Sequence, residues 1–528
     1  MGRMGMLDII VLVVYFASMA AMGPIFSWRS KTTEGYFLGD RSFPGWLIGF
    51  SMFAASISSI TFMAYPADAY KTAWLRMLPN FMLPVAVLMA SRLFLPFFRR
   101  GRITSAYEYL EGRFGPNVRL YAASAFIVGQ VIRISLILFL VSQLVETVTG
   151  LSSTYSVLIG GIITSFYTVT GGIQAVIWTD FIQAIVLWVG GLLCVAAVAV
   201  RLGGPIDGLA EVVRVGIADS KFQFADVIKG VPQTVHWGFD LTEKTVLLML
   251  LVGLGDWIYE YSGNQNVIQR YCASKNAKEA RRAMWLCCWF SVPTWALFMF
   301  LGTCLYAFYK AHPAADPTAM LTGAGGVKPE GILPYFVIHE LPAGLSGLVI
   351  AAVLAAAMSS ISSSMNAVSA VSVVDIYRRR MAPGRDDTHY VFVAKAVGVA
   401  QAVIMIGGAI ILVWVKSNTL QDTARVLGAL TAGGVAGLYL LGFLTRVGDG
   451  RAVLVAIVAT LAWTAWMALS KFAWWPEVLR SPIDSYYAGL LGHGIMFGVG
   501  YVLGLMLPKR KRDLHNFTVW TQDKAPLD

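Results

Sequence analysis

The chain has 528 residues, of which 57% are hydrophobic and only 13% are charged, whereas soluble domains carry roughly 25% charged residues. This composition excludes a soluble enzyme and leaves room for about a dozen membrane-spanning helices of roughly 20 apolar residues each. The net charge of +11 does not indicate a nucleic-acid-binding protein, because the basic residues alternate with apolar runs too long for such a module.

Apolar runs of spanning length predict one all-α polytopic membrane protein. The first run has features of a cleaved signal peptide, with Arg3 before it and small residues at 17–21, but it continues to Phe26 and is followed by Arg29 and Lys31. The length of the run and the basic residues after it favour a membrane helix over a signal peptide. Thirteen transmembrane helices are predicted in chain order, at residues 6–27, 44–70, 74–98, 119–148, 153–170, 174–200, 244–262, 282–309, 342–371, 390–415, 425–445, 452–470 and 486–507.

Lys and Arg residues are distributed unequally between the two sides of these spans. If the N-terminus lies outside, 24 of the 41 fall on the inner side and 14 on the outer side, with Arg92, Arg133 and Lys395 within spans. Because inner loops of membrane proteins are enriched in Lys and Arg, this bias predicts an outer N-terminus and a cytoplasmic C-terminus. The protein is therefore expected to be a multi-pass protein of the cell (inner) membrane, with residues 508–528 as a basic cytoplasmic tail.

Two spans contain polar residues that favour a broken helix. The second span places four hydroxyl residues and Pro66 in an apolar run at 54–66, and the seventh combines glycines, acids and amides at 253–265. Irregular backbone at membrane depth is tolerated where it lines a polar cavity, and paired interruptions point to a transporter's substrate site. The spacing of five spans predicts a single transporter domain with a first repeat at 44–200 and a second at 244–445. One extra helix (6–27) precedes the repeats and two (452–507) follow them.

The ninth span has five serines within six positions, at 359–364. Uncharged hydroxyl and carbonyl oxygens suit a hard monovalent cation such as Na+. Ser359, Ser362 and Ser363 share one helix face. The alternative is that small residues simply let helices pack closely in lipid.

Two charged residues lie within spans and need partners. Asp180 lies in an apolar run, where an acid costs about 2.5–3.5 kcal/mol on insertion scales. A bound cation and Arg133 are both candidate partners, and an interfacial position is the alternative. Arg133 lies near the middle of the fourth span, and its planar guanidinium suits a carboxylate ligand. A structural ion pair is the alternative role for Arg133.

Enzyme motifs find little support in this sequence. The five cysteines show no disulfide or zinc spacing, the six histidines are scattered, and no phosphate loop or nucleophile motif occurs. No catalytic residues are predicted, and the protein is expected not to be an enzyme.

Four motifs resemble the sodium:solute symporter family, over about residues 6–507. They are A-A-S-I at 54–57, G-G-x-x-A-V-x-W-T-D-x-x-Q at 171–183, N-Q-N-V-I-Q-R-Y at 264–271, and A-x-x-S-S at 356–360 followed by D-I-Y at 375–377. The resemblance implies the LeuT-type fold of two inverted five-helix repeats and sodium as the coupling ion.

Two sodium sites are implied by the resemblance. One would use the carbonyls of Ala54, Ile57 and Ala356 with the hydroxyls of Ser359 and Ser360. A second, known in some members, would use Asp180, Ser359, Ser362 and Ser363.

The chain resembles in particular the bacterial sialic acid transporters of this family. That likeness implies a secondary active sodium symporter that imports a sugar acid, most notably N-acetylneuraminate, by alternating access. The matching substrate residues are Ser56, Ser58, Thr61 and Arg133, with Asn80 as the polar residue of the third span. The acid Glu260 departs from this pattern.

The alternative cargo is a neutral sugar, a polyol or a small monocarboxylate, with Arg133 paired to Glu260 or Asp256. A channel or sensor is the alternative from another class. The expected partners are a small molecule, sodium ions and the lipid bilayer, without nucleic acid.

Overall fold

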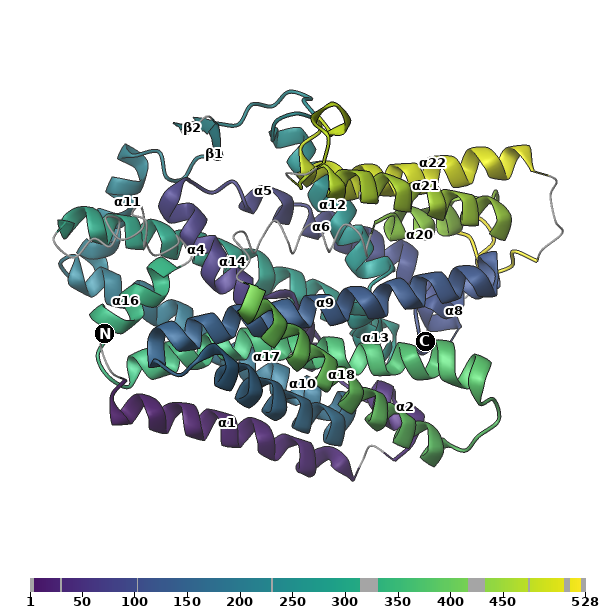
Figure 1. Ribbon diagram of the computed structural model, residues 1–528, viewed down its shortest axis with the longest axis horizontal. Helices are drawn as coiled ribbons and strands as arrows, with labels where there is room; N and C mark the ends of the chain where they lie inside the picture. Colours follow the sequence, from purple (N-terminus) through teal and green to yellow (C-terminus); the bar gives the residue numbers. More distant parts are fainter. Residues whose placement is uncertain are drawn as a thin grey trace.

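The computed structural model describes residues 4–28, 31–101, 103–228, 231–313, 331–415, 433–472, 475–507 and 513–523. These residues form a bundle whose long helices run along the long axis of the molecule (Figure 1). Strands β1 (Ala225–Ile228) and β2 (Val231–Thr234) form a small antiparallel hairpin at one end. The basic stretch 509–512 of the predicted tail and residues 425–432 of the eleventh predicted span lie outside the described residues.

Nine helices in the described part of the chain are long and apolar enough to cross a membrane. They are α1 (Met6–Ser27), the run from α5 (Met77–Asn80) through α6 (Leu83–Met89) and η2 (Ala90–Phe94) to α7 (Leu95–Arg100), α9 (Pro116–Thr149), α10 (Ser153–Arg201), α14 (Ala277–Ala311), α17 (Leu345–Val371) with its π-helical continuation η5 (Ser372–Met381), α18 (Asp387–Val415), α21 (Gly450–Leu469), and α22 (Ala488–Met506) with the preceding turn η7 (Ser485–Tyr487).

Shorter helices complete the described elements. They are α2 (Thr33–Leu38), η1 (Gly39–Arg41), α3 (Gly45–Ser56), α4 (Ser59–Lys71), α8 (Tyr107–Phe114), α11 (Pro205–Ala218), α12 (Val246–Ser262), α13 (Gln265–Cys272), α16 (Ile332–Glu340), α20 (Val435–Leu444) and η6 (Glu477–Leu479).

Helix α10 is too long for one crossing. Its 49 residues would extend about 74 Å at 1.5 Å per residue, more than twice the roughly 30 Å hydrocarbon core of a bilayer. Gly172 interrupts it with φ 59° and ψ −154°, and a Cβ there would lie 2.8 Å from the carbonyl oxygen of Tyr36. Only glycine adopts this conformation in the available space. The chain therefore turns between the segments expected at 153–170 and 174–200.

Two pairs of short helices meet at breaks. Helices α3 and α4 are bent by 57° at Ile57 and Ser58, where Ile57 has extended backbone angles. Helices α12 and α13 are separated by Gly263 and Asn264, and the Asn264 side chain caps α13 by accepting the N–H of Asn266 at 3.0 Å. Each break leaves the last carbonyls of one helix and the first N–H groups of the next without helical partners.

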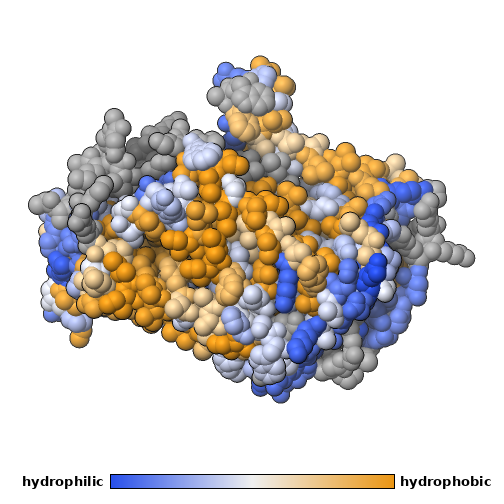
Figure 2. Space-filling model, turned by 60° about the horizontal axis from the view of Figure 1, so that its bottom comes forward, coloured by the Kyte–Doolittle hydropathy of each residue, from blue (hydrophilic) through white to orange (hydrophobic). Residues whose placement is uncertain are grey.

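Helix α17 lies at the centre of the bundle, where almost all of its side chains are buried. It packs against α1, α3, α9, α10 and α18. Small residues allow this close packing: a Cβ added to Gly190 of α10 would come within 2.4 Å of the Ala352 Cβ. Figure 2 shows apolar residues over the middle of one face and hydrophilic residues gathered at its right end, as expected for a protein embedded in a bilayer.

The start of α17 is held by an acid from the first helix. Asp8 is buried and its Oδ1 accepts hydrogen bonds of 2.7 Å from the N–H groups of Gly344 and Gly347 and from the Ser346 hydroxyl. A carboxylate is favourable at a helix N-terminus because the helix dipole is positive there. Asp8 therefore joins the start of α1 to the start of α17.

Candidate functional site

Helices α3 and α17 meet at a cluster of uncharged oxygen atoms. The Ser359 hydroxyl donates to the carbonyls of Ala54 at 3.0 Å and Ala356 at 3.1 Å, and the Ser360 hydroxyl donates to Ala356 at 3.2 Å. The structure thus brings together four of the five residues expected to form the first sodium site. Ile57, the fifth, is buried at the break itself, and its N–H donates to the carbonyl of Phe53 at 3.1 Å.

The location of this oxygen cluster suits a monovalent cation. Ala54 lies in the last turn of α3, where carbonyls lack helical partners and the helix dipole is negative. Neutral oxygens from such a helix end and from serines suit Na+. Within the described residues, no three His, Cys, Asp or Glu side chains gather in a metal-binding group.

Asp180 forms a buried ion pair with Arg270 of α13. Its Oδ2 lies 2.9 Å from the Arg270 Nη2 and accepts the Ser51 hydroxyl at 2.6 Å. The suggestion that Arg133 pairs with Asp180 is wrong. Arg270 occupies that position because α13 turns back towards α3 after the break at Gly263 and Asn264, which brings its side chain against α10.

Arg270 also joins Asp180 to the serines of α17. It donates to the Ser363 hydroxyl, and the hydroxyls of Ser363 and Ser362 donate to the Ser359 carbonyl at 2.5 and 3.2 Å. The four residues expected to form the second sodium site are therefore gathered in one region, with the Arg270 guanidinium among them. The Asp180 Oδ1 is buried and has no hydrogen-bond partner in the described part of the chain. This orphaned oxygen fits a cation ligand, since buried acceptors are almost always satisfied.

The expected substrate hydroxyls lie at the break between α3 and α4. Ser56 ends α3, half-buried, with its hydroxyl donating to the Met52 carbonyl at 2.9 Å. Ser58 caps α4 with its backbone, and Thr61 is buried in the first turn. The first N–H groups of α4 point towards the break, and a helix N-terminus attracts anions.

Arg133 lies near the middle of α9 and is half-buried. Its charge acts on the nearby carboxylate of Glu260, but that carboxylate accepts the Asn264 amide at 2.8 Å. Across the described residues, Arg133 makes neither a hydrogen bond nor an ion pair with protein groups. The proposed structural pairing with Glu260 or Asp256 is thus not formed. A half-buried guanidinium with no partner among the described residues suits an anionic ligand.

Asn80 lies at the end of α5. It is buried and its amide donates to the Tyr65 hydroxyl at 2.9 Å and to the Arg76 carbonyl at 3.0 Å. The hydrogen bond to Tyr65 therefore connects Asn80 of α5 to α4.

Two polar residues near the site were not identified from the sequence. Arg270 falls in a short helix, where hydropathy gives no sign that its charge is buried. Gln130, one turn before Arg133, is also buried. Its Oε1 accepts the Ser364 hydroxyl at 2.8 Å and the Asn266 amide at 3.3 Å. Its polarity within an apolar span was the available signal.

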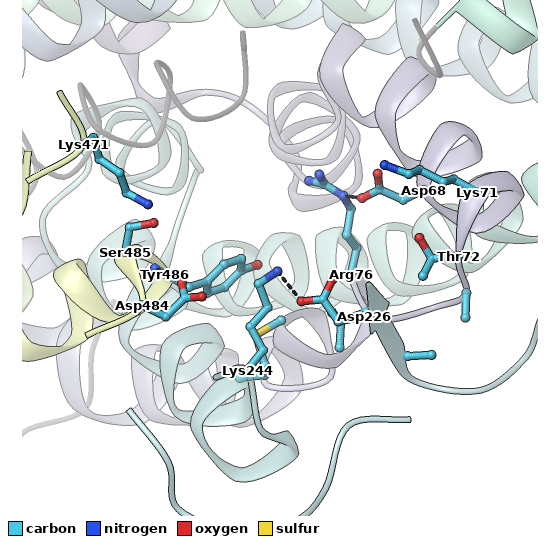
Figure 3. A pocket seen from close by; sticks show the side chains of 14 residues that line it. Asp68, Lys71, Thr72, Arg76, Asp226, Lys244, Lys471, Asp484, Ser485 and Tyr486 are labelled. Carbon is cyan, nitrogen blue, oxygen red and sulfur yellow. Dashed lines mark hydrogen bonds and ion pairs between the residues drawn. The ribbon is translucent and has the colours of Figure 1, made fainter. Parts of the chain in front are cut away.

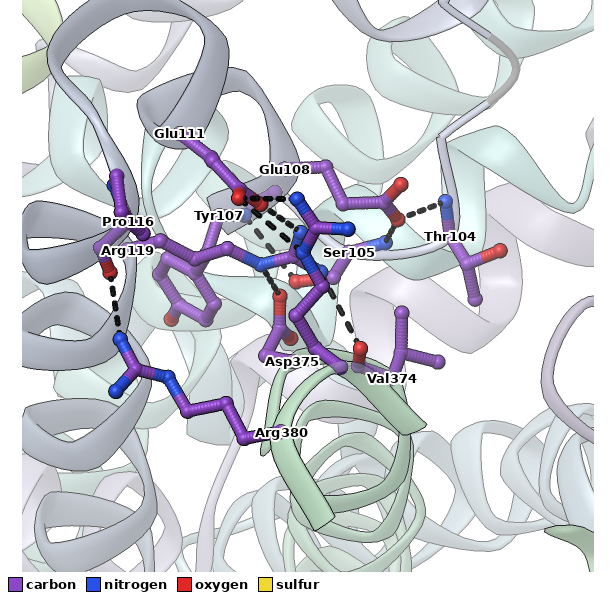
Figure 4. Close-up of polar contacts among 12 residues, drawn as sticks. Thr104, Ser105, Tyr107, Glu108, Glu111, Pro116, Arg119, Val374, Asp375 and Arg380 are labelled. Carbon is purple, nitrogen blue, oxygen red and sulfur yellow. Dashed lines mark hydrogen bonds and ion pairs between the residues drawn. The ribbon is translucent and has the colours of Figure 1, made fainter. Parts of the chain in front are cut away.

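A second network of hydrogen bonds and ion pairs lies at the end of the bundle where α9 begins. Arg119, at the start of α9, donates to Asp375 at 2.7 Å and to Glu111 at 2.5 Å (Figure 4). Glu111 of α8 also accepts Arg379 at 2.6 Å. Burial raises the pKa of Glu111, but the hydrogen bonds from Arg379 and Arg119 lower it by more, so that the net pKa lies below its ordinary value. These contacts hold α8, α9 and the end of α17 together.

Comparisons with known proteins place these observations in context. The model of the sodium:solute symporter family matches residues 36–458. The chain is 33% identical to the sodium/sialic acid symporter SiaT of Proteus mirabilis, over 87% of this chain and 89% of that protein. A solved Na+-coupled sialic acid symporter, in a substrate-bound outward-open state, is 29% identical with a TM-score of 0.85, over 96% of this chain and 99% of that chain. The nucleobase-cation-symport-1 transporter Mhp1, in a closed conformation, has a TM-score of 0.56 at 14% identity, over 92% of this chain and 98% of that chain, which shows a shared fold.

Proposed function

The chain belongs to the sodium:solute symporter family, and we propose that it imports a sialic acid, N-acetylneuraminate, together with Na+ across the cell (inner) membrane. The observation that carries this proposal is the Arg133 guanidinium, which has no hydrogen-bond or ion-pair partner among the described residues and belongs to α9, the helix that packs against α4 after the break between α3 and α4. Helix α4 packs against α9, and its positive N-terminus lies at that break. These two features favour a carboxylate in the same region. The hydroxyls of Ser56, Ser58 and Thr61 suit the polar groups of the sugar.

The proposed architecture has thirteen spans in the LeuT-type arrangement. The bent pair α3–α4 forms one broken span, α10 forms two spans joined at Gly172, and α12–α13 forms the broken seventh span. Helix α20 ends the second repeat. The repeats cover 44–200 and 244–445, with 6–27 before them and 452–507 after them.

The proposed orientation places the N-terminus outside and the C-terminus in the cytoplasm. The start of α1, α11 and the β1–β2 hairpin lie at one end of the bundle, and α22 ends at the opposite end (Figure 1). The second end includes Arg99 and the run Arg378–Arg380, which suits the cytoplasmic face.

Two sodium ions are proposed to bind. The first is held between α3 and α17 by Ala54, Ile57, Ala356, Ser359 and Ser360. The second is held near Asp180 with Ser359, Ser362 and Ser363, and the orphaned Asp180 Oδ1 supports this assignment.

Sodium at the first site would tie α3 to α17 and favour the substrate-ready state, since a ligand shifts an equilibrium through its differential affinity for the states. Inward opening would separate the Ser359 and Ser360 hydroxyls from Ala54 and release the ion. Each positive charge moved inward gains about 2.3 kcal/mol per 100 mV of membrane potential. Two Na+ ions with one anion carry net positive charge inward, so transport is expected to be electrogenic.

The test is uptake of labelled N-acetylneuraminate into proteoliposomes, with an inward Na+ gradient and a K+ control. We expect Arg133→Ala to lower uptake efficiency at least about 30-fold, because losing a partner of a buried charge pair costs 2 kcal/mol or more. Lys395→Ala is the matched control, since Lys395 is another half-buried cation within a predicted span. Uptake without Na+ dependence would contradict symport. Competition by neutral sugars, polyols or monocarboxylates, with sialic acid inactive, would replace the cargo.

A further inference from the structure

A charged pocket opens at the end of the bundle that carries the β1–β2 hairpin. Its cavity volume is about 330 Å³, within the usual range of small-molecule sites, about 300–1,000 Å³. The lining comes from the end of α4, the following turn, β1, the start of α12 and the segments beside α21 and α22 (Figure 3). In the proposed orientation this pocket faces the outside.

Basic groups outnumber acids around the pocket. The cations are Lys71, Arg76, Lys244 and Lys471, against Asp68, Asp226 and Asp484. Two pairs use part of this charge: Arg76 with Asp68, and Lys244 with Asp226 at 2.6 Å. Lys71 and Lys471 are exposed and form no ion pair with any described residue. Figure 3 shows them on opposite sides of the pocket. The pocket therefore presents two available ammonium groups to an anion.

The pocket lies directly outside the proposed substrate site. Arg76 is one helical turn from Asn80, whose amide donates to the Arg76 carbonyl. Asp68 is one turn from Tyr65, and Asn80 donates to the Tyr65 hydroxyl. Continuing along α4, Thr61 and Ser58 follow within three turns. The Asn80–Tyr65 hydrogen bond therefore crosses from α5 to α4 between the pocket and the break.

Hydrogen bonds hold the backbone that forms one wall of the pocket. Lys221 is buried and donates to the carbonyls of Tyr70 at 2.7 Å and Thr72 at 3.3 Å, on either side of Lys71. The indole N–H of Trp74 donates to the Thr303 hydroxyl at 3.1 Å, and the backbone N–H of Trp74 donates to the Gln223 carbonyl at 2.9 Å. These bonds fix the chain between α4 and α5, so the basic groups start from a fixed backbone.

We infer that this outer pocket is a separate, low-affinity binding site for the carboxylate of the substrate, occupied before the substrate passes Asn80 and Tyr65. The inference rests on the proposed function, because it takes the cargo to be a sugar acid. Lys71 and Lys471 attract the carboxylate, and Arg76 binds it in exchange for Asp68. A basic cavity concentrates anions and speeds their entry, and this effect weakens with ionic strength.

The transport test compares native protein with the double variant Lys71→Gln/Lys471→Gln at fixed Na+ concentration. We expect a rise in KM for N-acetylneuraminate of about three- to tenfold at low ionic strength, with little change in kcat. The difference should vanish when about 0.5 M N-methylglucamine chloride is added. Lys278→Gln is the matched control, because Lys278 is an exposed lysine at the opposite end of the bundle without an ion pair among the described residues. Equal KM values for the native protein and the double variant at low salt would overturn the inference.

A binding test separates this inference from the proposed function. Arg133→Ala removes the proposed inner site, so calorimetric titration with N-acetylneuraminate should show only a weak residual site. That site should be lost on adding Lys71→Gln/Lys471→Gln and should not bind the neutral sugar N-acetylmannosamine. Absence of residual binding, or binding unchanged by the lysine variants, would refute the pocket. Failure of the native protein to take up N-acetylneuraminate would instead refute the proposed function, whatever the result for the pocket.

Discussion

Asp180 and Arg270 lie 90 residues apart in the sequence and form an ion pair of 2.9 Å in which both side chains are almost fully buried. The pair joins α10, in the segment of the sixth predicted span, to α13, which follows the break at Gly263 and Asn264 and lies beyond the predicted seventh span at 244–262. It therefore couples the two proposed repeats beside the serines of α17.

Arg270→Ala is expected to destabilise the protein by about 3–5 kcal/mol, because it leaves the Asp180 carboxylate buried without its partner. Thermal unfolding of the detergent-purified protein measures this effect. The double variant Asp180→Asn/Arg270→Gln should regain part of the loss, since it leaves no unpaired charge.

Arg282→Ala serves as the control for that experiment. Arg282 is exposed and pairs with Glu279 one turn before it, and such surface pairs are worth less than about 1 kcal/mol. If Arg270→Ala were no more destabilising than Arg282→Ala, the buried pair would not have the importance assigned to it.

Removing a serine hydroxyl from the first proposed ion site should weaken sodium binding selectively. Ser359→Ala and Ser360→Ala are each expected to raise the Na+ concentration for half-maximal uptake about tenfold or more, because a bond to a charged group contributes roughly 1.5–3 kcal/mol. The measurement is the Na+ dependence of uptake at saturating substrate. Ser369→Ala, a buried serine further along α17, should leave this concentration unchanged. Similar shifts in all three variants would argue against a specific site.

The network of Arg119, Glu111 and Arg379 should limit how often its end of the bundle opens. Glu111→Gln removes the charge that holds Arg119 and Arg379 together. We expect alkylation of Cys272, a buried thiol of α13, to become about two- to fivefold faster, as loss of about 0.5–1 kcal/mol implies. Mass spectrometry of the labelled peptides gives the rate.

Cys194 provides an internal control for this labelling, because it is buried in the part of α10 that follows Gly172. Equal acceleration at Cys194 and Cys272 would indicate general loosening.

The pKa of Glu111 in the folded protein lies below its ordinary value of 4.5. The stabilising effect of Glu111 is therefore present above that pH and is lost as the pH falls through the lower folded value.

Lys221 should give the stability of the protein a distinct alkaline pH dependence. Burial lowers its pKa to about 8 from an ordinary value of 10.5. Between these values the unfolded chain binds more protons than the folded one, so stability rises with pH in this window. The gain is on the order of 2 to 3 kcal/mol.

The measurement is thermal unfolding of the native protein and Lys221→Met from pH 7 to 10. The native protein should gain stability relative to the variant above pH 8. Lys278→Met, which changes an exposed lysine, should follow the native curve. A constant difference between native protein and Lys221→Met would show that Lys221 does not titrate in this range.

The sequence predicted the helical membrane architecture well, because hydropathy reports directly on which segments enter lipid. Motif order also placed Ala54 and Ser359 in one site, and the structure brings their oxygens within 3.0 Å. Whether sodium binds there stays a prediction. Local patterns were informative where a residue type is costly in its surroundings, as with Asp180 in an apolar run.

The partner of Asp180 was beyond such reasoning. Arg133 was one of three cations inside predicted spans, whereas Arg270 belongs to a short polar helix whose burial depends on how α13 folds back. The same is true of Asn80, whose amide is used by Tyr65 and Arg76. Which side chains meet across a break depends on three-dimensional packing, to which hydropathy and spacing are blind.

The hydrogen bonds of Asp8 to the start of α17 have a mechanical consequence. Helix α1 exposes many of its apolar side chains at the surface of the bundle, including Leu7, Val13 and Val14. If α17 tilts or slides while these bonds persist, α1 must move with it and displace lipid. The viscosity and thickness of the bilayer then act as a load on the transport cycle, and the turnover rate becomes sensitive to membrane composition.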